Sequence, residues 1–212
     1  KADGPAHVSD DPFAHWPNVL LEAARALDNV IMVGHSTGGM FVLSVPELRE
    51  HLAGVVLIGS APHAEWRKRF FEFVERNPIP AVEQAAELYD QQPDDVRLRN
   101  LTLAAAPWNF TGEGLSAGRK ILADLPYNRD AVLWAEENFD DVYRARWTPV
   151  DVPALIISGE HDKVVDQSLW REAPGFDGPN VLHRTISDAG HFPWVENPDG
   201  VSAAFTNFAE RL

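Results

Sequence analysis

Residues 30–39 read VIMVGHSTGG, and this stretch decides the fold. Its first four residues are apolar without alternation, which favours a strand covered on both faces. The motif G-x-S-x-G follows with Ser36 at its centre, and a helical pattern comes after it. Only small residues fit two positions before and after the serine in so sharp a turn. The stretch therefore predicts a strand, a tight turn and a helix, with the Ser36 hydroxyl held out at the carboxyl end of a sheet.

Further strands of the same character follow along the chain. They are expected at 55–58, at 154–157 and, more weakly, at 181–186, with helical patterns between them and at 18–28. Strands that alternate with helices favour a doubly wound, mostly parallel α/β sheet. In such a sheet the carboxyl ends of the strands share one edge, so loops that follow different strands can meet there.

The stretch from about residue 60 to 152 has no convincing strand. Prolines interrupt it, and helical patterns are expected at 65–76, 81–89, 96–105, 115–125 and 130–147. We therefore expect a core formed by residues 1–60 and 150–212 and a helical insertion at 61–149. Residues 1–17 are polar and rich in Gly and Pro, which indicates an entry loop. Pro46 is expected to end the helix after the serine at Val45 and to begin a second helix over 46–52.

Composition excludes several classes of function. Of 212 residues, 18 are Lys or Arg and 32 are Asp or Glu, which gives a formal net charge of −14. Such a charge repels phosphate backbones and anionic membranes, so we expect neither nucleic acid nor a membrane as partner. The chain has no cysteine, which excludes thiol catalysis and zinc–thiolate sites. No metal-ligand spacing occurs around His35 or His161, so no metal or cofactor is expected. Our working expectation is a cytoplasmic protein.

A serine hydroxyl is a weak nucleophile that needs a base, and the base needs an orienting acid. Asp162 follows the predicted strand at 154–157, and His191 follows the predicted last strand. Both therefore fall at the sheet edge that also carries Ser36, in the chain order Ser, Asp, His. Three other acids lie nearby and compete with Asp162, namely Glu160, Asp166 and Asp188. We favour Asp162 because a loop after a strand can reach the Nδ1 atom of His191.

The motifs VIMVGHSTGG, GVVLIGSAP, PALIISGEHDKVV and DAGHFPWVENPDGV together resemble an α/β-hydrolase of the kind that carries a cap. The resemblance implies Ser36 as nucleophile, His191 as general base and then acid, and Asp162 as the orienting carboxylate. It also implies that the helical insertion is a cap which covers the site and selects substrate. The backbone N–H of Thr37 would face the oxyanion.

The same resemblance covers only the carboxyl-terminal two-thirds of the family's fold. Several strands and a second oxyanion donor normally precede the nucleophile strand, and nothing comparable lies before residue 30. We therefore expect an N-terminal chain or segment that completes the sheet. Candidates for the lining of a substrate pocket are His35, His63, Trp66, Trp108 and Trp194.

The function that we predict is a serine hydrolase that cleaves a small carboxylic ester or lactone through an acyl-enzyme. Two alternatives use the same machinery: a proline-iminopeptidase-like aminopeptidase and a C–C bond hydrolase. The aminopeptidase would need cap carboxylates for the substrate ammonium, and an acidic run at 136–141 offers them, although such runs are usually solvated helix faces. An alternative of another class is a non-catalytic ligand-binding module.

Overall fold

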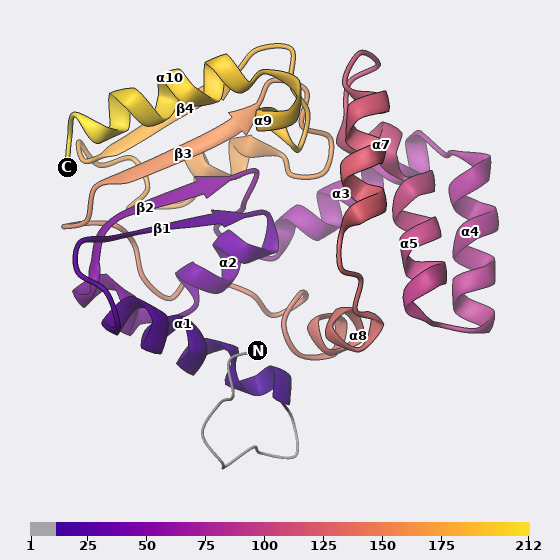
Figure 1. Ribbon diagram of the computed structural model, residues 1–212, viewed down its shortest axis with the longest axis horizontal. Coiled ribbons are helices and arrows are strands. Elements are labelled where there is room, and N and C mark those ends of the chain that lie inside the picture. Colours follow the sequence, from indigo (N-terminus) through magenta and orange to yellow (C-terminus); the bar gives the residue numbers. More distant parts are fainter. Residues whose placement is uncertain (1–11) are drawn as a thin grey trace.

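The computed structural model describes residues 12–212, and its centre is one four-stranded parallel sheet (Figure 1). The strands are β1 (Val30–His35), β2 (Leu52–Ile58), β3 (Ala154–Gly159) and β4 (Val181–Ile186). They lie side by side in chain order, and every neighbouring pair is parallel. All carboxyl ends therefore meet at one edge, and the predicted doubly wound α/β fold is confirmed.

Helices cover both faces of the sheet. Alternate residues of the central strands point to opposite faces, so each strand contributes to two cores. Val55 and Leu57 of β2 pack into one core with α1 (Trp16–Arg25), α2 (Thr37–Leu43) and the 3-10 helices η2 (Pro46–Glu50) and η3 (Gln167–Glu172). Val56 and Ile58 pack into the other with α10 (Pro198–Ala209), and the short helix α9 (Pro193–Glu196) precedes it. Figure 1 shows α10 and α1 on opposite sides of the strands. This double burial is why the strand sequences lack alternation.

Helices fill the chain between β2 and β3 and lie beyond the carboxyl edge of the sheet (Figure 1). They are α3 (Glu65–Arg76), α4 (Pro80–Gln91), α5 (Asp95–Ala104), α6 (Ala106–Asn109), α7 (Leu115–Asp124) and α8 (Arg129–Asn138). Within this stretch the structure places no strand, only an isolated bridge between His63 and Arg144. Helices thus occupy the predicted insertion as far as Asn138, and below we call these helices the cap.

The prediction of a helix over 130–147 is wrong after Asn138, where α8 ends. Beyond it, the carbonyl of Tyr143 accepts the Ala64 N–H, and the Ala145 N–H donates to the Pro62 carbonyl, both at 2.8 Å. The segment therefore satisfies its backbone against the chain that follows β2 rather than within a helix. Buried Trp147 fixes the path further by donating its indole N–H to the Val42 carbonyl at 2.9 Å. Tertiary contacts of this kind override local helix propensity.

Two smaller predictions near the N-terminal half also need correction. The helix after the serine ends at Leu43, two residues before the expected Val45, and Pro46 begins a 3-10 helix rather than an α-helix. The entry loop expected over 1–17 falls partly outside the described residues, and residues 12–17 are already helical. These differences shift the ends of elements and leave the turn at Ser36 in place.

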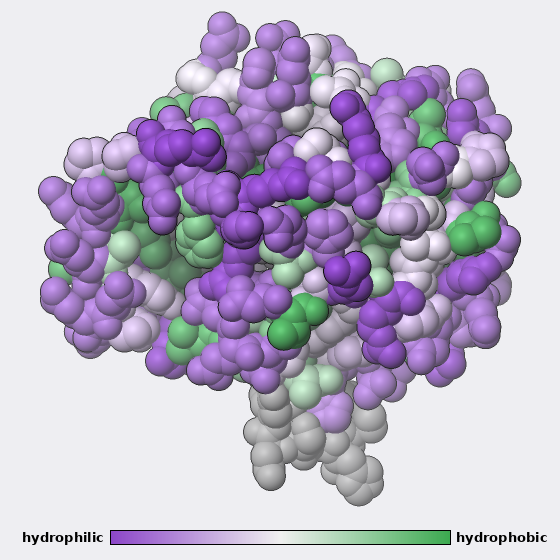
Figure 2. All heavy atoms as spheres, turned by 180° about the vertical axis from the view of Figure 1, so that it is seen from behind, coloured by the Kyte–Doolittle hydropathy of each residue, from purple (hydrophilic) through white to green (hydrophobic). Residues whose placement is uncertain are grey.

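The outer edge of β1 has no strand partner within residues 12–212. Ile31 and Val33 of this strand are exposed, unlike their counterparts in β2. An apolar groove of about 820 Å³ runs beside β1 and reaches α1, α2 and α8. Elsewhere the surface is mostly hydrophilic, as Figure 2 shows for the face opposite that of Figure 1. Among the described residues, no helix is long and apolar enough to cross a membrane.

Candidate active site

Ser36 occupies a strained turn between β1 and α2. Its φ of 52° and ψ of −127° lie in a region that residues with a side chain rarely adopt. The Ser36 N–H donates to the Ile58 carbonyl at 2.9 Å, and its carbonyl accepts the Gly39 N–H at 3.0 Å. A Cβ on Gly34 would lie only 2.5 Å from the Gly39 Cα, which explains why a glycine stands two positions before the serine.

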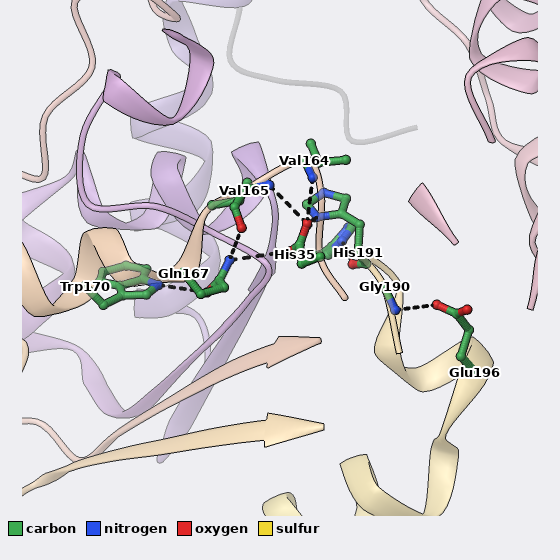
Figure 3. Close-up of polar contacts among 9 residues, drawn as sticks. His35, Val164, Val165, Gln167, Trp170, Gly190, His191 and Glu196 are labelled. Carbon is green, nitrogen blue, oxygen red and sulfur yellow. Dashed lines mark hydrogen bonds and ion pairs between the residues drawn. The ribbon is translucent and has the colours of Figure 1, made fainter. Parts of the chain in front are cut away.

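His191 and Asp162 form a buried pair at the same edge of the sheet. Nδ1 of His191 lies 3.0 Å from Oδ2 of Asp162 and 3.2 Å from Oδ1. Their side chains are only 4% and 1% exposed. The Asp162 carboxylate also accepts the N–H groups of Val164 and Val165 at 2.9 and 3.0 Å (Figure 3). These bonds fix the carboxylate in the orientation that holds the histidine ring.

The three competing acids lie elsewhere. Asp166 caps η3 through the Ser168 N–H and pairs with Arg69. Glu160 and Asp188 are exposed, and Glu160 accepts the Asp188 N–H at 3.2 Å. Together with His161 they place potential ligand atoms within 4.8 Å of one another, but all three are exposed. Of the four acids, Asp162 is therefore the one that contacts His191.

Two hydrogen bonds hold the backbone of His191 from different directions. Its N–H donates to the Asn109 carbonyl of the cap at 2.8 Å. Its carbonyl lies 2.9 Å from Nε2 of His35. Burial, together with nearby His191, lowers the pKa of His35 to about 4, so this ring is neutral at pH 7 and its Nε2–H donates. A side chain at Gly59 would also press on the His191 ring, since its Cβ would lie 3.0 Å from Nδ1.

The residues expected to line a substrate pocket divide into two groups. His35 lines the apolar groove together with Thr37. The ring of Trp194 packs edge-on against the ring of His35, with 4.7 Å between the ring centroids. Trp108 is buried in the cap and donates its indole N–H to the Asn77 carbonyl. Trp66 packs on the core between α2 and the cap, and His63 bridges to Arg144. Trp108, Trp66 and His63 thus form the second group, which contacts other parts of the protein and does not line the groove.

Sequence reasoning missed contacts that only the fold brings together. Gln167 reaches Oδ2 of Asp162 at 3.4 Å, and Asn109 uses a backbone carbonyl, which carries no signal in sequence. Within residues 12–212 no hydrogen bond joins the Ser36 hydroxyl to His191, although both lie at the carboxyl edge. Such bonds commonly tighten only when substrate binds.

Comparison with known proteins agrees with this architecture. The family model described as "Alpha/beta hydrolase family" matches residues 2–204. The chain is 25% identical over 210 residues to a pimeloyl-[acyl-carrier protein] methyl ester esterase of Xylella fastidiosa (strain M12), covering 97% of this chain and 80% of the relative. The chain therefore belongs to the α/β hydrolase family.

Solved structures share the fold. An α/β fold family hydrolase from Bacillus anthracis str. Sterne superposes with a TM-score of 0.73 at 21% identity, covering 92% of this chain and 73% of that one. An esterase from Rhodococcus sp. ECU1013 superposes with a TM-score of 0.62 at 22% identity, covering 94% and 73%. At such identities the likeness concerns the fold.

Proposed function

We propose that this chain is a serine hydrolase that cleaves a small carboxylic ester or lactone through a Ser36–His191–Asp162 triad. The observation that carries the proposal is the buried contact of 3.0 Å between Asp162 and Nδ1 of His191. A carboxylate on Nδ1 keeps the proton on that atom and leaves Nε2 free to accept one. The strained turn supplies the nucleophile that such a base requires.

The reaction proceeds in two halves. His191 takes the proton of the Ser36 hydroxyl as the oxygen attacks the substrate carbonyl, and Asp162 stabilises the imidazolium that forms. The tetrahedral intermediate collapses when His191 returns the proton to the leaving alcohol. Water, activated by the same histidine, then attacks the acyl-enzyme and releases the acid, which restores Ser36.

The oxyanion needs backbone donors close to Ser36. Thr37 is the first residue of α2, and the first N–H groups of a helix have no carbonyl partner within it. The Thr37 N–H is therefore placed to stabilise the developing charge. We propose that a second donor comes from a segment, on this chain or another, which lies along the open edge of β1. The unpaired edge of β1 supports this part of the proposal.

The groove also favours an apolar substrate group. Its lining next to Thr37 and Gly38 is mainly aromatic and aliphatic, with contributions from Trp16, Phe41 and Val132. Apolar pockets with few polar groups bind apolar chains and leave specificity to the reacting centre. The esterase name of the Xylella relative agrees with an ester as substrate.

The direct test is an intact-mass spectrum after incubation with a fluorophosphonate, which labels an activated serine. We expect one adduct on the wild-type chain and none on Ser36→Ala. Hydrolysis of p-nitrophenyl esters of increasing acyl length then measures the preference of the groove. Absence of an adduct in the wild type would contradict the proposal. If ligand binding in the groove persisted without labelling, a non-catalytic binding module would be the better description.

A further inference from the structure

Glu196 connects the cap to the loop that carries His191. This glutamate ends α9, five residues after the histidine. One carboxylate oxygen, Oε1, accepts the Thr111 N–H at 2.7 Å and the Thr111 hydroxyl at 2.6 Å, and Thr111 lies between α6 and α7 of the cap. The other oxygen, Oε2, accepts the Gly190 N–H at 2.7 Å (Figure 3). A single half-buried carboxylate therefore bridges the two parts of the chain.

The bridge acts directly beside the catalytic base. Gly190 precedes His191, whose own N–H is held by the Asn109 carbonyl two residues before Thr111. Two consecutive N–H groups of the histidine loop are thus anchored through the cap segment 109–111. The segment and the histidine loop pack too closely to move independently of each other, because a Cβ on Gly190 would lie 2.5 Å from the Asn109 carbonyl oxygen. A Cβ on Gly114, which follows in the cap, would collide with the Glu196 carboxylate.

We propose that Glu196 is a positioning residue that couples the seating of the cap to the placement of His191. When segment 109–111 is seated, Glu196 and the Asn109 carbonyl hold the backbone at 190–191, and the imidazole meets Asp162. When the cap shifts, the same bonds draw the histidine loop with it. This proposal rests on the proposed triad, since a misplaced base matters only where the base is used.

The hydrogen bonds of the bridge make Glu196→Gln an informative substitution. Three donors converge on the two carboxylate oxygens: the Thr111 N–H, the Thr111 hydroxyl and the Gly190 N–H. Both oxygens therefore act as acceptors. Glutamine keeps the size of the side chain but offers one oxygen and one NH₂ group. Whichever way its amide turns, an N–H of the side chain faces a donor of the cap or of the loop. Glu196→Gln should therefore break one half of the bridge without leaving a cavity.

The experiment compares four variants of the whole chain: two single variants of the bridge, their double variant and a control. Glu196→Gln should lower kcat for a small p-nitrophenyl ester by about 10- to 100-fold at unchanged KM, because small displacements of a catalytic group cost rate rather than binding. Thr111→Val removes one donor to Oε1 and should give a smaller loss, and the double variant should be no worse than Glu196→Gln alone. Glu160→Gln is the matched control, since that exposed carboxylate also accepts an N–H of the same loop, that of Asp188. It should stay within about twofold of wild type.

A second measurement needs no substrate. The Nδ1 proton of His191 on Asp162 should give a far-downfield proton resonance, and amide exchange reports the hydrogen bonds of Gly190 and His191. Glu196→Gln should broaden or shift that resonance and speed both exchanges, while the melting temperature separates this change from general unfolding. Unchanged kcat together with an unchanged resonance would overturn the coupling. If the wild type failed to react with fluorophosphonate but the variant changed the resonance and exchange, the hydrolase proposal would fall and the coupling would stand.

Discussion

Replacing Asp162 with asparagine perturbs the proposed triad while keeping the shape of the side chain. The asparagine oxygen can still accept the N–H groups of Val164 and Val165, as Oδ1 of Asp162 does. Its NH₂ group then takes the place of Oδ2, which lies 3.0 Å from Nδ1 of His191. Because NH₂ is a donor, Nδ1 must become the acceptor, and the proton of the neutral ring moves to Nε2. The histidine then presents an N–H to Ser36 and cannot remove its proton.

The expected loss follows from this change of tautomer. In a serine triad the same substitution costs about 10⁴-fold in kcat, or about 5 kcal/mol of transition-state stabilisation. The loss of folding stability should be small by comparison, since two backbone N–H groups keep their acceptor. The variant should therefore purify as a folded protein with a melting temperature near that of the wild type. The substitution should therefore lower activity and leave folding nearly unchanged.

The assay is kcat/KM for an activated ester alongside the rate of labelling by fluorophosphonate. Asp188→Asn is the matched control, because it makes the same change in an exposed acid close to His191 in sequence. Asp188 has a φ of 54°, which asparagine tolerates well, so the control should fold and keep full activity. The reasoning is refuted if Asp162→Asn keeps a rate within about tenfold of wild type. It is equally refuted if Asp188→Asn loses as much.

Three further predictions test the turn, a buried histidine and the acidic run. Gly34→Ala should lower the free energy of unfolding by about 3 kcal/mol in urea titrations, because its Cβ meets the backbone of α2 at 2.5 Å. Gly38→Ala, whose Cβ has no neighbour within 4 Å, should change it by less than about 1 kcal/mol. The pKa of His35 is lowered to about 4, so the unfolded chain binds its proton first, and stability is lost as pH falls from 6.5 to 4, by about 3 kcal/mol. His35→Gln should remove that part of the pH dependence, and an unaltered slope would argue against it. Neutralising exposed Glu136 and Glu137 should leave KM for esters unchanged, whereas a raised KM for an aminoacyl substrate would favour the aminopeptidase.

The parts of the fold that sequence could predict are those in which local pattern and tertiary burial agree. Strand β2 is apolar throughout because helices cover both of its faces, and the glycine two residues before Ser36 is required by direct contact. Strand β1 has the same apolar pattern, but its Ile31 and Val33 are exposed, so the expectation of cover on both faces is wrong for this strand. The helical pattern at 65–76 predicts α3 over the residues that form it. The end of α8 could not be predicted in this way, since the backbone beyond Asn138 bonds to the chain after β2.

The site shows the same division. Ser36, Asp162 and His191 follow strands, so the rule for carboxyl ends predicts that they share one edge, and the structure brings Asp162 and His191 into contact. The contacts of Asn109 and Glu196 with the histidine loop depend on how the cap sits over the sheet. That placement is a long-range property, and no periodicity or motif spacing encodes it.

The two outer edges of the sheet differ in how readily a further strand can pair with them. At β4 the exposed ring of His183 and the guanidinium of Arg184 flank the outer edge, and such polar and charged groups discourage another strand from pairing. At β1, residues 30–34 carry no charged side chain, and an apolar groove lies beside the strand. A further strand is therefore expected to pair with β1 and not with β4. A strand added in trans would extend the sheet at the β1 side, next to Ser36, so mixing this chain with a peptide that pairs with β1 should raise the rate of the proposed ester hydrolysis.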